Sequence, residues 1–107
     1  MLNRIFVYGS LRRGYDNRYA QLLHANATFL GEARMRGRKV KAGEYLGMKG
    51  ALTAEDWVEG EIFEMHNAQT LLPQLDSYEG EEYERRPQMA ALADRRELEC
   101  WVYLYLL

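Results

Sequence analysis

The sequence predicts a single domain, spanning residues 1–107, of the α+β class: a small mixed β-barrel of five to six strands with two short flanking helices. Three observations support this fold class. Runs of strand length and composition alternate with only two segments of helical periodicity. The chain has 107 residues, 48% of them hydrophobic, which is the size and balance of one globular domain. It contains no internal repeat, linker or low-complexity segment.

The N-terminal part of the chain predicts a strand, a loop and a helix. Arg4–Tyr8 is a β-branched and aromatic run that ends at Gly9, typical of a strand inside a sheet. Apolar residues then recur at helical spacing, at Tyr19, Leu22 and Leu23. We therefore expect a short helix from Asn17 to His24, with Asp16 or Asn17 capping its first turn.

The middle of the chain predicts three strands and one irregular segment. Thr28–Arg36 and Arg38–Ala42 have strand composition and are separated by Gly37. Three glycines follow in quick succession, Gly43, Gly47 and Gly50. Because glycine marks turns, we expect no regular element there. Val58–Met65 returns to strand character, and its imperfect alternation indicates that both of its faces are partly covered.

A second helix is predicted before Gly80, a residue type that commonly follows a helix C-terminus. Its apolar stripe consists of Leu71, Leu72, Leu75 and Tyr78. Either Asn67 or Thr70 can cap this helix. We favour Thr70, because Pro73 then lies in the first turn, where its missing N–H costs nothing.

The end of the chain predicts a hairpin. Tyr83–Leu92 and Glu97–Leu106 both have strand composition and flank the turn Ala93–Arg96. With these two strands, the predicted total reaches the five to six strands of a small barrel.

Charge and composition exclude several classes of protein. Fourteen Lys and Arg against 16 Asp and Glu give a net charge of −2, so we expect neither nucleic acid nor an anionic membrane as partner. The longest apolar run, Trp101–Leu107, is far shorter than the roughly 20 residues that cross a bilayer. The opening residues MLNRIFVYGS have too short an apolar run for a signal peptide, so we expect none, and the single Cys100 cannot form an intramolecular disulfide. We therefore expect a cytoplasmic location.

Three other features have ordinary structural explanations. Arg34, Arg36 and Arg38 would share a strand face, but no aromatic residue interleaves them, so a solvated face explains them without nucleic acid. The histidines and the cysteine lie far apart without ligand spacing, so no metal site is predicted. His24 is expected to complement a helix dipole, and Cys100 to pack in the barrel wall.

The segment Tyr8, Gly9, Ser10 and Leu11 lies where the first strand leads towards a helix. A turn of this kind can aim several backbone N–H groups at one point and bind a carboxylate or phosphate. The segment lacks the glycine patterns of dinucleotide and P-loop sites, so it does not predict nucleotide binding. The alternative is an ordinary tight turn.

Glu79 is the second candidate for chemistry, because it lies in the last turn of the predicted second helix. The negative end of the helix dipole opposes a further negative charge there, as do the neighbouring acids Glu81, Glu82 and Glu84. If Glu79 is also partly buried, its pKa rises towards neutrality, which suits a general base. The alternative is a solvated acidic turn paired with Arg85 and Arg86.

Tyr83 and Arg85 share one face of the strand that follows Glu79. They can steady Glu79, bind a substrate carboxylate, or serve only the fold. Tyr103 and Tyr105 also share a parity, and periodicity leaves open whether they line a cavity or a packed face.

Five motifs occur in order along the chain: VYGSLRRG at 7–14, GEIFEM at 60–65, LDSYEG at 75–80, YERR at 83–86 and WVYLY at 101–105. Together they span nearly the whole chain and resemble the gamma-glutamylcyclotransferase-like family, of the gamma-glutamylamine cyclotransferase type. The family fold is a small mixed β-barrel with flanking helices. The resemblance implies that Tyr8, Gly9, Ser10 and Leu11 form the substrate-binding turn and that Glu79 is the catalytic acid/base.

The resemblance also implies a reaction and a substrate class. The substrate is a small γ-glutamyl compound, whose α-amine attacks its own γ-carbonyl, closing 5-oxoproline and expelling the attached amine. The enzyme is of acyltransferase or lyase type and needs no cofactor. A carboxylate moves the protons, while the turn holds either the glutamyl carboxylate or the developing oxyanion. The rival hypothesis is a non-enzymatic module that binds a small carboxylate in the same cavity.

One segment departs from the family pattern. Many relatives carry a Trp/Tyr-Pro-Gly/Ala segment after the third strand, whereas Gly43–Met48 contains no proline. The substrate pocket is therefore expected to differ there.

Overall fold

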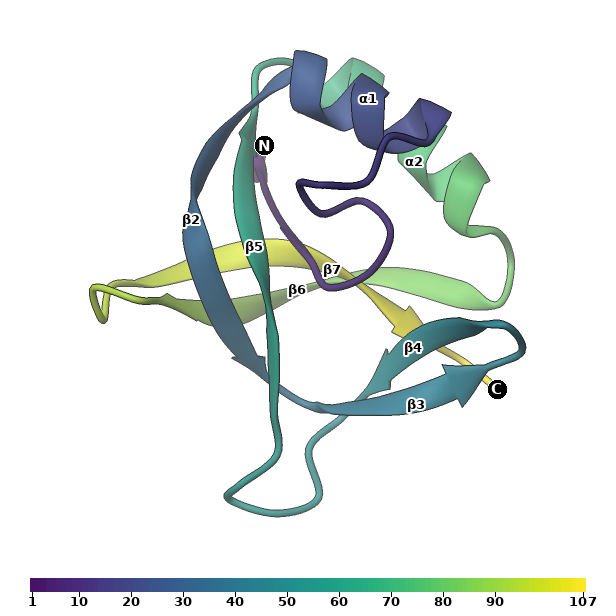
Figure 1. Ribbon diagram of the computed structural model, residues 1–107. Coiled ribbons are helices and arrows are strands. Elements are labelled where there is room, and N and C mark those ends of the chain that lie inside the picture. The colour runs from purple at the N-terminus through teal and green to yellow at the C-terminus, as the bar shows by residue number, and fades with distance from the viewer.

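The computed structural model describes all 107 residues. Two short helices lie side by side over one end of a closed barrel, and a separate two-stranded sheet lies beside it (Figure 1). The elements in chain order are β1 (Arg4–Val7), α1 (Arg18–Ala25), β2 (Ala27–Arg36), β3 (Arg38–Ala42), β4 (Tyr45–Lys49), β5 (Trp57–Met65), α2 (Ala68–Glu79), β6 (Tyr83–Leu92) and β7 (Glu97–Tyr105). Neither helix has the length and apolar character needed to cross a membrane.

The barrel contains five strands in the order β1-β5-β2-β6-β7. It closes where β7 returns to β1, with Ile5 opposite Trp101. That pairing is parallel and the other four are antiparallel, so the barrel is mixed. The α+β fold predicted from the sequence, with its two short helices, is therefore confirmed.

The strand β4 corrects the expectation of an irregular segment. Tyr45–Lys49 pairs antiparallel with β3 around the two-residue turn Gly43-Glu44, where Gly43 has a φ of +64°. Gly47 lies within β4 against Tyr105 of β7, and a Cβ at this position would come within 2.6 Å of the Tyr105 Cβ. Glycine at position 47 therefore permits close packing inside a strand and does not mark a turn.

Helix α2 begins earlier than predicted, so the preference for Thr70 as its cap was wrong. Asn67 is the N-cap, and its side chain accepts a hydrogen bond of 3.4 Å from the backbone N–H of Thr70. Pro73 consequently lies inside the helix, where it cannot donate a backbone hydrogen bond. Ala68 and Leu71 are buried, and packing of this early turn outweighs the local cost of proline.

Two apolar clusters on opposite sides of the barrel wall hold the fold together. One fills the barrel with side chains that include Phe6, Met35, Ile62 and Val102. The other lies between the wall and the helices and includes Ile5, Val7, Phe63, Leu23 and Leu75. Strand β5 contributes to both clusters, as its imperfect alternation predicts. The second cluster holds α2 across the end of β1, where the candidate site lies.

Cys100 lies in the barrel cluster and is fully buried, and burial raises the pKa of its thiol to about 12. We expect the native thiol to resist iodoacetamide at neutral pH, because the reactive thiolate is scarce. Cys100→Ala should lower the free energy of unfolding by about 1 kcal/mol and leave turnover per folded molecule unchanged. Rapid alkylation of the native protein, or an inactive folded variant, would contradict this prediction.

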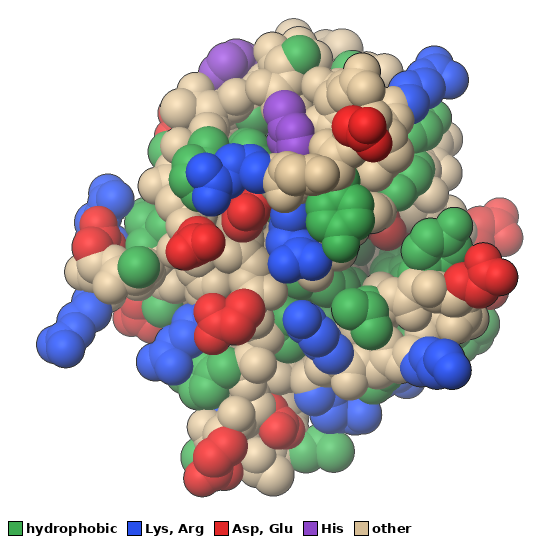
Figure 2. All heavy atoms as spheres, viewed as in Figure 1, with side chains coloured by type: hydrophobic (Ala, Val, Ile, Leu, Met, Phe, Trp, Pro, Cys, Tyr) green, Lys and Arg blue, Asp and Glu red, His purple; other side chains and the backbone are tan.

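Acidic and basic side chains are intermixed on the face shown in Figure 2. In strand β2, the guanidinium carbons of Arg34 and Arg36 lie 4.2 and 5.2 Å from the ring centre of Trp57. An aromatic residue therefore does accompany these arginines, because antiparallel pairing places Trp57 opposite Arg36. Arg36 also donates to the carbonyls of Thr53 and Ala54, so its donors are engaged within the protein.

Candidate active site

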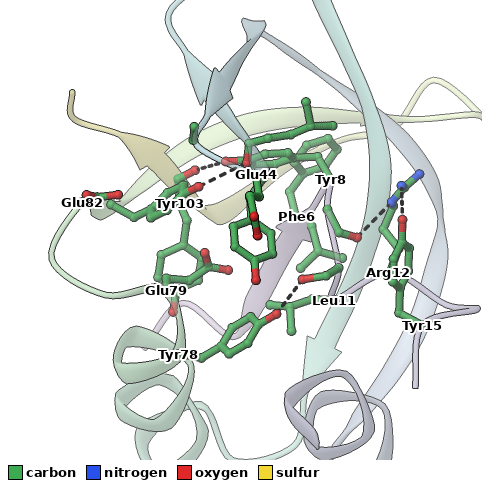
Figure 3. A pocket seen from close by; sticks show the side chains of 17 residues that line it. Phe6, Tyr8, Leu11, Arg12, Tyr15, Glu44, Tyr78, Glu79, Glu82 and Tyr103 are labelled. Carbon is green, nitrogen blue, oxygen red and sulfur yellow. Dashed lines mark hydrogen bonds between the residues drawn. The ribbon is translucent and has the colours of Figure 1, made fainter. Parts of the chain in front are cut away.

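A cavity of about 520 Å³ opens at the end of β1, bordered by the end of α2 and by the β3–β4 turn. In Figure 3, Glu79 and Tyr78 extend from α2 into the space that Tyr8, Leu11 and Tyr103 border. Six of the seven site residues predicted from the sequence line this cavity: Tyr8, Gly9, Ser10, Leu11, Glu79 and Tyr83. Residues from opposite ends of the chain thus form one site.

The segment Tyr8–Leu11, here called the cradle, has the carbonyl groups of its last three residues bound to the protein. The Gly9 carbonyl accepts from the backbone N–H and Nε of Arg12, both at 3.1 Å. The Ser10 carbonyl accepts from Asn17 Nδ2 at 2.8 Å, and the Leu11 carbonyl accepts from His24 Nε2 at 2.8 Å. A carbonyl only accepts, so His24 carries its hydrogen on Nε2.

The backbone N–H groups of Gly9, Ser10 and Leu11 make no hydrogen bond within the protein. Backbone N–H groups in proteins are normally paired. Three unpaired N–H groups in a row on a cavity wall can therefore bind a ligand that accepts hydrogen bonds. The N–H of one residue shares a peptide group with the carbonyl of the preceding residue and points the opposite way. The bound Gly9 and Ser10 carbonyls therefore turn the N–H groups of Ser10 and Leu11 away from these partners, where a ligand can reach them. The cradle can therefore bind a carboxylate or an oxyanion, as its sequence predicts.

Residues of α1 and β5 hold the cradle in place, and sequence analysis did not assign them this role. Asn17 caps α1 through Oδ1, which accepts from the Ala20 N–H at 2.9 Å, while its Nδ2 binds the cradle. His24 was expected to serve the helix dipole, but its ring binds the cradle and stacks on Phe63. Just after the cradle, the backbone N–H of Arg13 donates to the buried carboxylate of Glu61 at 2.7 Å.

The cradle also contacts helix α2 directly. Ser10 Oγ and Tyr78 Oη lie 2.6 Å apart in a hydrogen bond, and both residues line the cavity. The Tyr78 ring stacks on Tyr19 of α1, with ring centres 4.6 Å apart. These contacts place the end of α2, and with it Glu79, against the cradle.

Glu79 is half-buried at the C-terminal end of α2, directly before Gly80, whose φ of +84° ends the helix. Burial raises the pKa of its carboxyl group from the ordinary 4.5 to about 7. The direction of this shift agrees with the expectation from the sequence, but its cause is removal of the carboxyl group from water rather than the helix dipole or the neighbouring acids. A carboxyl group with this pKa exchanges protons readily at neutral pH.

Glu79 forms no ion pair, which argues against the alternative of a solvated acidic turn. The arginines that would have paired with it have other partners. Arg85 pairs with Asp76 at 2.8 Å, and Arg86 pairs with Glu84 at 2.8 Å. The Glu79 carboxylate is therefore free to meet a ligand.

Comparison with known families matches residues 5–107 to the family described as gamma-glutamyl cyclotransferase, AIG2-like. The chain belongs to this family. A Methanocaldococcus jannaschii protein named "putative gamma-glutamylcyclotransferase" is 30% identical over 106 residues, covering 94% of this chain and 82% of that protein. The crystal structure of an AIG2-like protein from Mus musculus has 28% identity and a TM-score of 0.77, covering 96% of this chain and 76% of that chain. The family resemblance predicted from the motifs is thus confirmed.

Arg85 is the one predicted site residue of this AIG2-like protein that does not line the cavity. Its Nε and Nη2 donate to Asp76 Oδ1 and Oδ2 at 2.8 and 3.1 Å, and its guanidinium lies over the ring of Trp101. The geometry therefore does not support a direct contact between Arg85 and a substrate carboxylate. Asp76 was not singled out, although the LDSYEG motif contains it, because a lone helical carboxylate does not reveal its partner.

The β3–β4 turn of this family member supplies a wall that sequence analysis also missed. Glu44, Tyr45 and Leu46 line the cavity mouth, and Tyr83 Oη donates to the Leu46 carbonyl at 3.2 Å. This wall is the proline-free segment that departs from the family pattern. No group of three or more His, Cys, Asp or Glu side chains that could hold a metal ion occurs in the structure.

Three phenols surround Glu79, and each has a raised pKa. Burial, with the Glu79 charge as a further cause, raises the pKa of Tyr8 and Tyr83; burial and the hydrogen bond to Asp76 raise that of Tyr103. Tyr8 Oη donates to the Tyr103 carbonyl at 2.7 Å. All three hydroxyls therefore remain protonated at neutral pH, and they donate their hydrogens to the Tyr103 carbonyl, the Leu46 carbonyl and Asp76 rather than to Glu79.

Proposed function

We propose that this protein is a gamma-glutamyl cyclotransferase that releases 5-oxoproline from a γ-glutamyl amine or peptide by intramolecular aminolysis. Family membership supports an enzyme of the cyclotransferase type. One observation carries the mechanism: Glu79, unpaired and with a pKa of about 7, shares a cavity with the three free N–H groups of the cradle. Glu79 is the general acid/base, and the cradle is the anion-binding element.

The reaction transfers an acyl group within one molecule. After the substrate α-ammonium group has lost one proton to water, the amine nitrogen attacks the γ-carbonyl carbon, and a new C–N bond closes the five-membered ring. Glu79 takes the second proton from that nitrogen. The bond between the γ-carbon and the attached nitrogen then breaks as Glu79 returns a proton to the leaving amine. Bonds and protons balance without a co-reactant, so the proposal requires no cofactor.

The cavity supplies geometry as well as proton transfer. The γ-glutamyl chain must fold back for its amine to meet its own carbonyl, and holding that conformer lowers the entropic part of the activation barrier. The cradle N–H groups bind either the α-carboxylate or the oxyanion that develops on the γ-carbonyl oxygen. Tyr83 lines the same cavity and contributes to the binding surface.

The test is a screen of γ-glutamyl amino acids, γ-glutamyl amines and γ-glutamyl dipeptides for release of 5-oxoproline by the folded protein. We expect release from at least one class, with saturation kinetics. Saturable binding of these compounds without release would instead favour the binding module considered from the sequence. Absence of both binding and release across all three classes would overturn the proposal.

A further inference from the structure

The side chain of Glu79 makes no hydrogen bond or ion pair, so other residues must hold its carboxylate over the cavity. Asp76 lies one turn earlier on α2, outside the cavity lining. It accepts three hydrogen bonds, two from Arg85 of β6 and one of 2.7 Å from Tyr103 Oη of β7. These bonds join the last turn of α2 to two barrel strands.

We propose that Asp76, held by Arg85 and Tyr103, is a positioning residue that sets where the Glu79 carboxylate stands in the cavity. The inference rests on the proposed function, because it concerns how the general acid/base is placed. Asp76 itself touches neither the cavity nor the substrate; it acts through the helix turn that carries Glu79.

The geometry of these hydrogen bonds makes Asp76 a precise anchor. A planar guanidinium that binds both oxygens of one carboxylate fixes orientation as well as distance, and such charge-assisted pairs are stronger than neutral hydrogen bonds. The last turn of α2 contains no basic side chain. The Asp76 side chain therefore attaches the end of α2 to β6 and β7.

Tyr103 links this anchor to the other half of the site. Its hydroxyl donates to Asp76, while its backbone carbonyl accepts from Tyr8 Oη at the start of the cradle. One residue of β7 thus contacts both the cradle and the helix turn that carries Glu79. The separation between the anion-binding N–H groups and the carboxylate depends on this residue.

The two carboxyl groups of α2 have opposite environments. Burial alone would raise the pKa of Asp76, but hydrogen bonds from Arg85 and Tyr103 outweigh it and hold the pKa below its usual range. Asp76 therefore remains ionised and anchored when Glu79 exchanges protons. The other titratable residues that line the cavity with Glu79 are Tyr8, Arg12, Tyr15, Glu44, Tyr45, Tyr78, Glu82, Tyr83 and Tyr103.

The test compares Asp76→Asn and Tyr103→Phe with a matched control, Glu84→Gln, which breaks an exposed ion pair on the same strand as Arg85. Two readouts are taken on folded protein: kcat and KM for a γ-glutamyl substrate, and the pKa of Glu79 from the ¹³C shift of its carboxyl carbon. We expect Asp76→Asn to lower kcat about 10–10²-fold with KM within about threefold. Tyr103→Phe should show a smaller loss of the same kind.

The Glu79 titration should move in a stated direction. When the helix turn loosens, water reaches the carboxyl group, so its pKa should fall from about 7 towards 4.5 in both variants and stay unchanged in Glu84→Gln. Tyr103→Phe leaves the ion pair between Arg85 and Asp76 intact. A lower pKa of Glu79 in this variant therefore cannot be caused by an unpaired Arg85 guanidinium. If Asp76→Asn does not fold, the measurements on Tyr103→Phe alone still test the proposal.

Unchanged kcat and an unchanged Glu79 titration in folded Asp76→Asn and Tyr103→Phe would overturn the proposal and leave Asp76 as a purely structural residue. Failure of the proposed function looks different. In that case wild type releases no 5-oxoproline from any substrate, while the Glu79 titration still reports whether Asp76 positions the carboxyl group.

Discussion

Folded Glu79→Gln is expected to lose about 10²–10⁴-fold in kcat while binding γ-glutamyl ligands with nearly unchanged affinity. Glutamine keeps the size and hydrogen-bonding reach of the side chain but cannot carry the proton from the attacking amine to the leaving nitrogen. The measurement is 5-oxoproline release under saturation, normalised to folded protein, together with ligand titration. Because the change is nearly isosteric, a lower kcat with an unchanged binding constant identifies loss of proton transfer.

The pH dependence of this variant provides a second criterion. In wild type the rate should rise as Glu79 deprotonates, with a midpoint near its pKa of about 7, and this limb should be absent in Glu79→Gln.

Glu79→Gln should be more stable than wild type although it is less active. The folded state raises the Glu79 pKa from 4.5 to about 7, so the stability contributed by its protonated form is complete below pH 4.5 and is lost as the pH rises through 7. Glutamine does not ionise, so the variant should gain in Tm relative to wild type across that range. Equal 5-oxoproline release by folded Glu79→Gln and wild type would show that the proposed mechanism is wrong, even though the family assignment stands.

Gly9→Val is expected to abolish binding of γ-glutamyl ligands while leaving the protein folded. A glycine at the end of a strand can adopt an unusual φ, which is what we expected of Gly9, but Gly9 is not among the glycines with positive φ and the expectation is wrong. A Cβ at this position would meet no atom within 4 Å. The valine side chain would instead occupy open space at the cradle, where a ligand must approach the free N–H groups.

Gly50→Val is the matched control for this substitution. A Cβ at Gly50 would also meet no atom within 4 Å, and Gly50 has no positive φ and lies outside the cavity lining. Thermal unfolding should show similar Tm values for both variants, and calorimetric titration should show ligand binding only in Gly50→Val. Binding by folded Gly9→Val with unchanged affinity would place the anion-binding element elsewhere.

Local sequence patterns identified most of the elements and both halves of the candidate site. Alternation and β-branched composition predicted the barrel strands, and helical spacing predicted the two helices, because these patterns reflect which side of one element is buried. The boundaries of these elements drew attention to the cradle and Glu79, and the family resemblance supplied the roles expected of them. Each lies at the boundary of an element, where the ends of strands and helices leave backbone groups unpaired.

Features that depend on packing were predicted poorly. Gly47 was expected to mark a turn, yet it lies within a strand because the Tyr105 side chain packs directly against it. Pro73 favoured a late start for α2, yet burial of Ala68 and Leu71 draws the earlier turn into the helix. In each case a contact with a distant element outweighed a local preference.

The sequence by itself determined the fold class, the family resemblance and the residue types available for chemistry. Only the tertiary structure decided that Arg85 binds Asp76, that the carbonyl groups of the cradle are tied back, and that Glu79 is removed from water. The hydrogen bond from Tyr8 to Tyr103 joins residues 95 positions apart in the chain. Such contacts, and the burial that raises the pKa of Glu79, arise only when the barrel closes, because no local pattern encodes which distant groups meet.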